Sequence, residues 1–305
     1  MSVLRPRAVA FLVVCASWLA SADEAHAYCR TRTDPVGSDD CAAKGPSLYW
    51  ENQCVTYTVN KAGSAKAEIT KARSIIAAAF APWTAKNGVC TPGVKVIELT
   101  PTDTSTVGYD KTNPGANENV IVFRDKTWPY NDAGNPLALT TVTFNAENGE
   151  ILDADIEVNT ADKGVTSQEP LPPTGYDLQS IITHEAGHFL GLAHSKVGGS
   201  TMEPRYDRGQ TGLRTLENDD QRGICAIYPS SDQRTSDETG GVSPITIKAL
   251  ACSTSPPTPS TATATSPGGC SCRAVGVGSG LGLSDVALAA AVLAGITARS
   301  RRRRA

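Results

Sequence analysis

The stretch His184-Glu-Ala-Gly-His188-Phe-Leu-Gly191-Leu-Ala-His194 contains three of the four histidines in this chain of 305 residues. His184 and His188 are four residues apart, so in a helix they lie on one face, one turn apart. Gly191 can end such a helix in the left-handed conformation that glycine adopts without penalty. The chain then turns back, and His194 approaches from another direction. The stretch predicts a zinc site with three histidine ligands and one open position.

Glu185 follows the first histidine and is rotated away from both helical ligands. This placement puts its carboxylate near the open position, where it can take a proton from a water that the metal has made more acidic. A structural zinc is the alternative, but it would fill the fourth position with Cys or His. The fourth histidine, His26, lies in a segment that we expect to be removed. We therefore predict a catalytic zinc with Glu185 as the general base.

The first 27 residues have the pattern of a secretory signal peptide. Arg5 and Arg7 precede an apolar run from Ala8 to Ala20, and small residues of the cleavage type end at Ala27. The run is too short for a membrane span, which makes a permanent anchor the weaker reading. We predict that residues 1–27 are a signal peptide and that the chain is exported.

The C-terminal part changes composition twice. Residues 231–269 are rich in Ser, Thr and Pro without an apolar period, which predicts an extended linker. Within 270–305, residues 275–298 carry one charge, Asp285, and five arginines follow. A run of about 20 apolar residues can cross a membrane, and the arginines would stay on the cytoplasmic side. We predict membrane association through this segment; a buried core helix is the alternative.

Charge and cysteine content limit the function classes. Acidic residues exceed basic ones by 31 to 28, which argues against nucleic acid as a partner. Nine cysteines become eight after signal cleavage, and an even number in an exported chain suggests disulfides. The sequence leaves the pairing open. Cys29–Cys41 and Cys54–Cys90 are the neighbouring pairs to test first.

An α+β domain is predicted for residues 51–230, after a polar lead at 28–50. Helical spacing predicts a long helix from Ile69, perturbed near Pro82 and terminated by Gly88. It also predicts the histidine helix after Asp177 and a last helix from near Thr215. Asn148-Gly149 predicts a hairpin between the last two strands. The expected strands are Val55–Val59, Val94–Leu99, Val120–Phe123, Leu139–Phe144 and Ile151–Val158.

The histidine stretch, followed by Met202-Glu-Pro204-Arg-Tyr206, resembles the metzincin zinc metalloproteases, and specifically the matrixins, the matrix metalloproteinase-like group. Their signature is His-Glu-x-x-His-x-x-Gly-x-x-His followed by a methionine turn. The resemblance implies a zincin-like fold: a twisted mixed sheet of about five strands, three main helices, and a zinc cleft beneath the edge strand. It also implies one catalytic zinc and the hydrolysis of peptide bonds in protein or peptide substrates.

The resemblance also implies site residues beyond the ligands. Met202 would form a hydrophobic floor beneath the zinc, and Pro204, Arg205 and Tyr206 would form one wall of the S1′ pocket. The segment that ends in Leu137 and Ala138 resembles the loop and edge strand along which matrixin substrates lie antiparallel. Residues 216–224 resemble the last matrixin helix.

Three features depart from the matrixin pattern. The chain lacks the further histidines of a second, structural zinc, and Leu139 stands where one of them is expected. No Pro-Arg-Cys-Gly latency motif precedes the domain. Glu203 replaces the usual aromatic residue, so the pocket preference cannot be transferred. Four acidic residues could bind calcium, although a solvated acidic surface also explains them: Asp132, Asp153, Asp155 and Glu157.

The tail carries a second resemblance. The run Gly-Gly-Cys270-Ser-Cys272-Arg, an apolar stretch and the terminal arginines look like the C-terminal sorting signal of myxobacterial surface proteins. This resemblance implies that sorting machinery processes the tail and anchors the protein at the cell surface. A permanent single-span anchor is the alternative.

Two other functions fit three histidines. One is a non-catalytic surface adhesion module that keeps zinc for stability. The other is a family of three-histidine endoribonucleases, but these lack a glutamate after the first histidine and work in the cytoplasm. Glu185, the signal peptide and the acidic charge together favour the peptidase.

Overall fold

The computed structural model describes residues 28–35, 40–130 and 136–230, together with four short strands beyond them. These strands are β11 (Gln233–Arg234), β12 (Ile245–Thr246), β13 (Val292–Ala294) and β14 (Thr297–Ala298). The predicted signal peptide, most of the linker and most of the C-terminal segment lie outside the described residues. Within the described part, no helix is long and apolar enough to cross a membrane.

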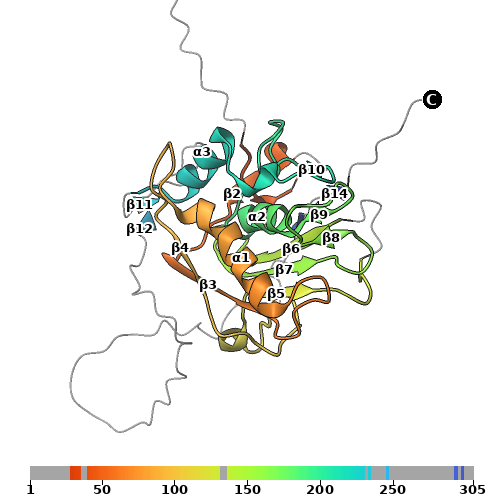
Figure 1. The fold of residues 1–305 in the computed structure, drawn as a ribbon. Coiled ribbons are helices and arrows are strands. Elements are labelled where there is room, and N and C mark those ends of the chain that lie inside the picture. Colours follow the sequence, from red (N-terminus) through yellow and green to blue (C-terminus); the bar gives the residue numbers. More distant parts are fainter. Residues whose placement is uncertain are drawn as a thin grey trace, which may run out of the picture.

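A twisted mixed sheet forms one layer of the domain (Figure 1). Neighbouring strands run parallel in the order β7, β5, β3, β4, while β6 pairs antiparallel with β7. These five strands confirm the predicted sheet and the α+β class, and β13 adds to the outer edge of β6. Their bounds are β3 Cys54–Val59, β4 Lys95–Glu98, β5 Val120–Phe123, β6 Ala138–Phe144 and β7 Ile151–Val158.

Helices α1 (Ile69–Thr84) and α2 (Leu178–Phe189) pack on one another and against the sheet (Figure 1). The buried face of α1 includes Phe80 and Trp83. The Phe80 ring stacks on Tyr57 of β3 at 4.8 Å and meets Phe189 of α2 edge-on at 5.2 Å, measured between ring centroids. Through Phe80, this aromatic cluster connects the histidine helix α2 to strand β3 of the sheet.

Two predicted helix bounds are wrong. Helix α1 ends at Thr84, before Gly88, because Ala85 is already extended. Helix α3 (Asn218–Ile227) begins later than Thr215, which is extended after the short 3-10 helix η3 (Gly212–Arg214). A reciprocal capping box between Glu217 and Asp220 sets its start instead, because it satisfies backbone N–H groups of the first turn.

The disulfides confirm one suggested pair and overturn the other. Cys29 is bonded to Cys41, as suggested, but Cys90 is bonded to Cys225 of α3 rather than to Cys54. Cys54 is itself disulfide-bonded. The reason is the fold: the loop after α1 packs on the end of α3, where the Gly93 N–H donates to the Tyr228 carbonyl at 2.9 Å.

The lead at 28–50 is joined to the domain in space. Strands β1 (Arg32–Asp34) and β2 (Lys44–Ser47) pair antiparallel, with the 3-10 helix η1 (Asp40–Ala42) between them. The Thr31 N–H donates to the Gly191 carbonyl at 3.0 Å, and Leu48 is fully buried. The lead therefore packs against the turn that follows α2.

The solvated acidic surface considered in the sequence analysis is wrong for strand β7, because its acidic residues are buried. Asp153, Asp155 and Glu157 are each 1% exposed. Asp155 accepts the N–H groups of Gly108 and Val120 at 2.6 and 2.8 Å. Burial, followed by repulsion from Asp155, raises the pKa of Asp153. Asp132 lies outside the described residues.

Candidate zinc site

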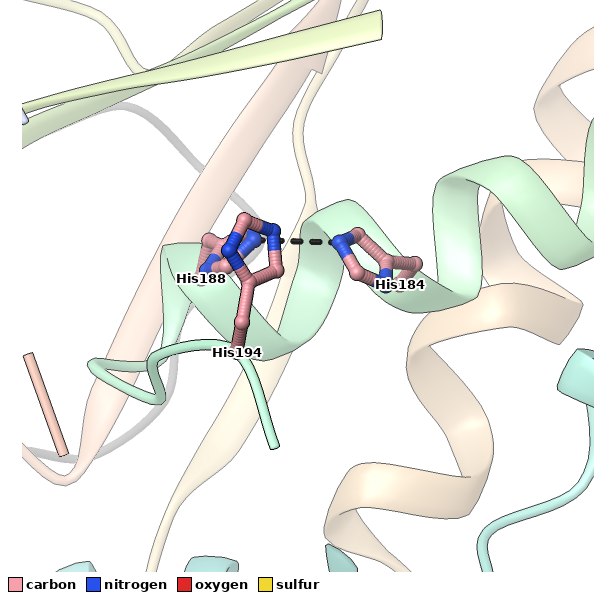
Figure 2. A group of neighbouring side chains, drawn as sticks. All are labelled: His184, His188 and His194. Atoms are coloured by element: carbon pink, nitrogen blue, oxygen red, sulfur yellow. Dashed lines mark hydrogen bonds between the residues drawn. The ribbon is translucent and has the colours of Figure 1, made fainter. Parts of the chain in front are cut away.

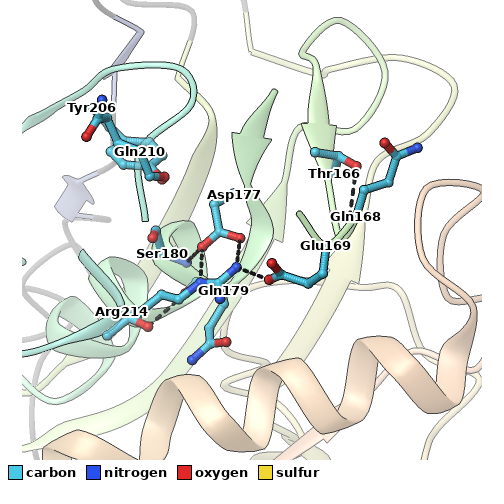
Figure 3. A network of polar contacts seen from close by, with 10 residues as sticks. Thr166, Gln168, Glu169, Asp177, Gln179, Ser180, Tyr206, Gln210 and Arg214 are labelled. Atoms are coloured by element: carbon cyan, nitrogen blue, oxygen red, sulfur yellow. Dashed lines mark hydrogen bonds and ion pairs between the residues drawn. The ribbon is translucent and has the colours of Figure 1, made fainter. Parts of the chain in front are cut away.

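Helix α2 begins with a cap that is itself held in place. The Asp177 carboxylate accepts the Ser180 N–H at 2.8 Å, which satisfies one of the N–H groups left open at a helix start. Arg214 of η3 donates to both oxygens of the same carboxylate, at 2.7 and 2.6 Å, and also bonds Glu169 (Figure 3). The sequence predicted the cap but not its arginine partner.

The end of α2 requires a glycine. Leu190 caps the helix, and Gly191 follows with a φ of 97°, a conformation that side-chain-bearing residues rarely adopt. A Cβ at Gly191 would also lie 2.7 Å from the Leu48 carbonyl oxygen. The predicted turn is therefore needed both for the backbone conformation and for the close packing of the lead.

His184 and His188 are oriented by backbone carbonyls. The Nδ1 of His184 lies 2.7 Å from the Thr201 oxygen, and the Nδ1 of His188 lies 2.8 Å from the Leu192 oxygen. Because a carbonyl only accepts, each Nδ1 must donate, which leaves a lone pair on each Nε2. The two Nε2 atoms face one another at 3.1 Å.

Burial keeps both imidazoles neutral. Both rings are buried, and burial lowers the pKa of His184 to about 3 and that of His188 well below its ordinary value. The positive charge of a protonated His194 would act in the same direction. Two facing lone pairs at this distance repel one another unless a cation lies between them. The donor chemistry of the pair thus fits a metal ion.

His194 completes the group from the loop after α2. Its ring centroid lies 5.3 Å from that of His184 and 4.8 Å from that of His188. Figure 2 shows the three rings gathered in one place. Its Nε2 is buried and has no hydrogen-bond partner in the described part of the chain. One ligand atom from each ring lies within 4.8 Å of the others. Three imidazoles converging in this way fit a zinc ion.

Met202 is 2% exposed, and its role as a floor beneath the zinc stays a prediction. A Cβ added at Gly187, within the His-Glu-x-x-His turn of α2, would lie 2.2 Å from the Met202 sulfur. The methionine turn is held by Asp220 of α3, whose carboxylate accepts the N–H groups of Thr201 and Met202 at 2.7 and 3.1 Å. Asp220 therefore also fixes the carbonyl that orients His184.

Glu185 is fully buried on the side of α2 that packs against strand β6. The hydroxyl of Thr140 donates to its Oε2 at 2.6 Å. Thr140 was not singled out in the sequence, because no motif marks it and only the position of β6 brings it to the helix. This contact connects the predicted base with the strand predicted to bind substrate.

The predicted pocket residues lie on two elements. Leu137 and Ala138 are fully buried at the start of β6. Arg205 and Tyr206 form the short strand β10, with Pro204 half-buried before it and Arg205 exposed. The Tyr206 ring packs beside the Tyr176 ring, with 6.1 Å between the ring centroids, and the Tyr206 hydroxyl donates to the Gln210 carbonyl. Their role as a pocket wall stays a prediction.

The fold and the three-histidine group define a zincin-like domain. The family profile described as Matrixin matches residues 49–229, more than half of the chain, so the chain belongs to the matrixin family. This result confirms the family named by the histidine stretch and the methionine turn.

Individual relatives match over short stretches. Neutrophil collagenase of Homo sapiens is 47% identical over 53 residues, covering 17% of this chain and 11% of that protein. Metalloendoproteinase 2-MMP of Arabidopsis thaliana is 38% identical over 78 residues, covering 22% and 20%. Matrilysin of Mus musculus is 48% identical over 54 residues, covering 18% and 20%. The chain thus matches at most about a fifth of the length of these relatives.

Proposed function

We propose that the protein is an exported zinc endopeptidase that hydrolyses peptide bonds of protein or peptide substrates. The observation that carries this proposal is the buried Glu185 carboxylate, positioned by Thr140 and adjacent in sequence to the converging histidines. His184, His188 and His194 would hold the zinc, which when bound supplies a Lewis acid for water and for the scissile carbonyl.

The protein's own groups would carry out the proton transfers. Glu185 accepts a proton from the attacking water and returns it to the leaving amine, as a general base and then a general acid. The Thr140 hydroxyl fixes the orientation of the carboxylate. Leu137 and Ala138, at the start of β6 and outside its pairing with β13, would lie along an extended substrate. Pro204, Arg205 and Tyr206 would line the side chain that follows the scissile bond.

The test is cleavage of a denatured protein and a peptide library by the zinc-loaded full chain. We expect cleavage that a chelator abolishes and zinc restores, and that Glu185→Ala reduces by at least 10²-fold. Glu147→Gln, on an exposed turn, is the matched control. A zinc-loaded chain that cleaves nothing would favour the alternative, a zinc-stabilised surface adhesion module.

Export and anchoring form a separate part of the proposal. The signal-like residues 1–27 would direct export, and the segment 270–305 would engage sorting machinery and the membrane at the cell surface. Fractionation of cells expressing the full chain tests this. A Cys270→Ser, Cys272→Ser variant should be released into the medium or retained unprocessed, whereas unchanged surface localisation would argue against a sorting role.

Calcium binding also stays a prediction. The raised pKa of Asp153 reduces the negative charge available on β7 near neutral pH, so a calcium site there requires proton release. Calorimetric titration at pH 7 and pH 9 measures it: binding that strengthens at the higher pH would support calcium, and no heat at either pH would exclude it.

A further inference from the structure

We propose that Asp40, in the lead, is a positioning residue for the zinc ligand His194, and that the Cys29–Cys41 disulfide holds it in place. The proposal rests on the zinc site of the proposed function and adds a residue far from the histidine stretch in sequence. It also makes zinc affinity depend on the oxidation state of one disulfide.

The contact between Asp40 and His194 is double. The Asp40 Oδ2 atom lies 2.8 Å from the His194 Nδ1 and accepts the His194 backbone N–H at 3.3 Å. One carboxylate oxygen thus restrains both the ring and the backbone of this residue. With Nδ1 donating to the carboxylate, the lone pair is on Nε2, the atom that has no partner in the described structure.

His194 needs such a restraint more than the other two histidines. His184 and His188 belong to a buried helix, and their rings donate to backbone carbonyls. His194 lies in the loop beyond that helix, and its side chain is 20% exposed. Its ring orientation therefore depends on a side chain from elsewhere, and Asp40 is the carboxylate that reaches it.

The disulfide connects the two sides of this contact. Cys41 directly follows Asp40 in η1 and is bonded to Cys29. The backbone carbonyl of Cys29 accepts the Ala193 N–H at 2.9 Å. Ala193 directly precedes His194. The Thr31 hydroxyl also bonds the Leu192 carbonyl at 2.9 Å. The disulfide therefore fastens the segment carrying Asp40 to the segment carrying His194.

A carboxylate that accepts the second N–H of a ligating histidine fixes its tautomer and raises its basicity, and removal of such a partner typically weakens metal binding by about 10–100-fold. Reduction of Cys29–Cys41 would leave η1 without its covalent tie. We therefore expect the zinc site to be weaker in a reduced chain, even though none of the zinc ligands is a cysteine.

The test is the zinc dissociation constant of the full chain, measured by competition with a chromophoric chelator. We expect Asp40→Ala to weaken zinc binding by about 10–100-fold, and Asp40→Asn by less, because an amide oxygen can still accept the Nδ1–H. A Cys29→Ser, Cys41→Ser variant should also bind zinc more weakly. Asp34→Asn, an exposed residue of the same lead, should stay within about twofold of wild type.

The cobalt-substituted protein gives a second readout that a purely structural role would not change. Its visible d–d spectrum reports ligand geometry, so it should shift in Asp40→Ala while the circular dichroism spectrum stays the same. Wild-type zinc affinity and an unchanged cobalt spectrum in a folded Asp40→Ala or Asp40→Asn variant would overturn the proposal. Unchanged affinity in the cysteine variant would overturn the role of the disulfide.

These readouts separate this inference from the proposed function. A chain that binds zinc tightly, loses affinity on Asp40 substitution and cleaves no substrate would refute the peptidase and support the role of Asp40. A chain that cleaves substrates with equal zinc affinity in all variants would do the reverse.

Discussion

The Thr140 hydroxyl lies 2.6 Å from the Oε2 of Glu185 and so links strand β6 to the helix that carries two of the histidines. One strand therefore carries Ala138, a predicted substrate-pocket residue, and also orients the proposed base. A shift of β6 relative to α2 would disturb both. This relationship gives the first prediction.

Thr140→Val removes the hydroxyl and keeps the shape of the side chain. We expect cleavage to fall about tenfold or more, with zinc content unchanged, because a buried carboxylate without its donor is less well oriented and costs about 1–3 kcal/mol in lost hydrogen bonding. Steady-state cleavage of a fluorogenic peptide measures this. Thr141→Val, at the next position of the strand, is the control, and equal losses in both would contradict a specific role.

Gly187→Ala should destabilise the domain, although alanine normally favours a helix over glycine by about 1 kcal/mol. The added Cβ would meet the Met202 sulfur at 2.2 Å and the Trp83 ring at 2.9 Å. We expect a loss of about 1–3 kcal/mol from overpacking. Denaturant unfolding measures it. The loss should shrink in a Met202→Ala background, and additive effects would argue against a clash with Met202.

Asp153→Asn should change how stability depends on pH. Burial, together with Asp155, raises the pKa of Asp153 from 3.8 to about 8 in the folded chain. Between these pH values Asp153 holds a proton in the folded chain that it loses in the unfolded chain. The contribution of Asp153 to the free energy of unfolding is therefore greatest below pH 3.8 and falls as the pH rises toward 8. The limit is about 1.4 kcal/mol per pH unit for one proton.

Unfolding in urea at pH 5 and pH 8 checks this prediction. Wild type should lose stability between the two, and Asp153→Asn should lose less and be the more stable protein at pH 8. Asp103→Asn, an exposed aspartate, is the control. A steeper loss in the variant would show that Asp153 is ionised in the folded protein.

Zinc removal should lower stability as well as activity. A ligand that binds only the folded state adds about 2.7 kcal/mol at 100 times its dissociation constant. We expect a chelator to lower the melting temperature of wild type and to have little effect on His194→Ala. An equal decrease in both would indicate that the chelator acts elsewhere.

The histidine helix and the sheet were predictable because their signals are local. Val120–Phe123 and Ile151–Val158 are apolar runs with clear ends, and the structure has both strands with those bounds. Asp177 was expected to cap the histidine helix, and it does. Each of these predictions needs a window of a dozen residues and no tertiary contact.

The groups that hold the site together could not be predicted in this way. Thr140, Asp40 and Asp220 reach their partners across 45, 154 and 18 residues of sequence. The pairing of Cys90 likewise depends on where α3 packs. The acidic residues of β7 show the same limit: a solvated acidic surface also explained them in the sequence, but β7 lies between β6 and β5 and these side chains are buried.

The Cys90–Cys225 bond determines what happens to the domain when its backbone is cut. It joins residues 135 apart and so closes a ring that contains β4 to β7, the histidine helix and the methionine turn. A single proteolytic cut anywhere in that ring leaves both fragments covalently joined. Nicked molecules should therefore run as one band without reductant and as two with it, and they should keep their zinc site assembled.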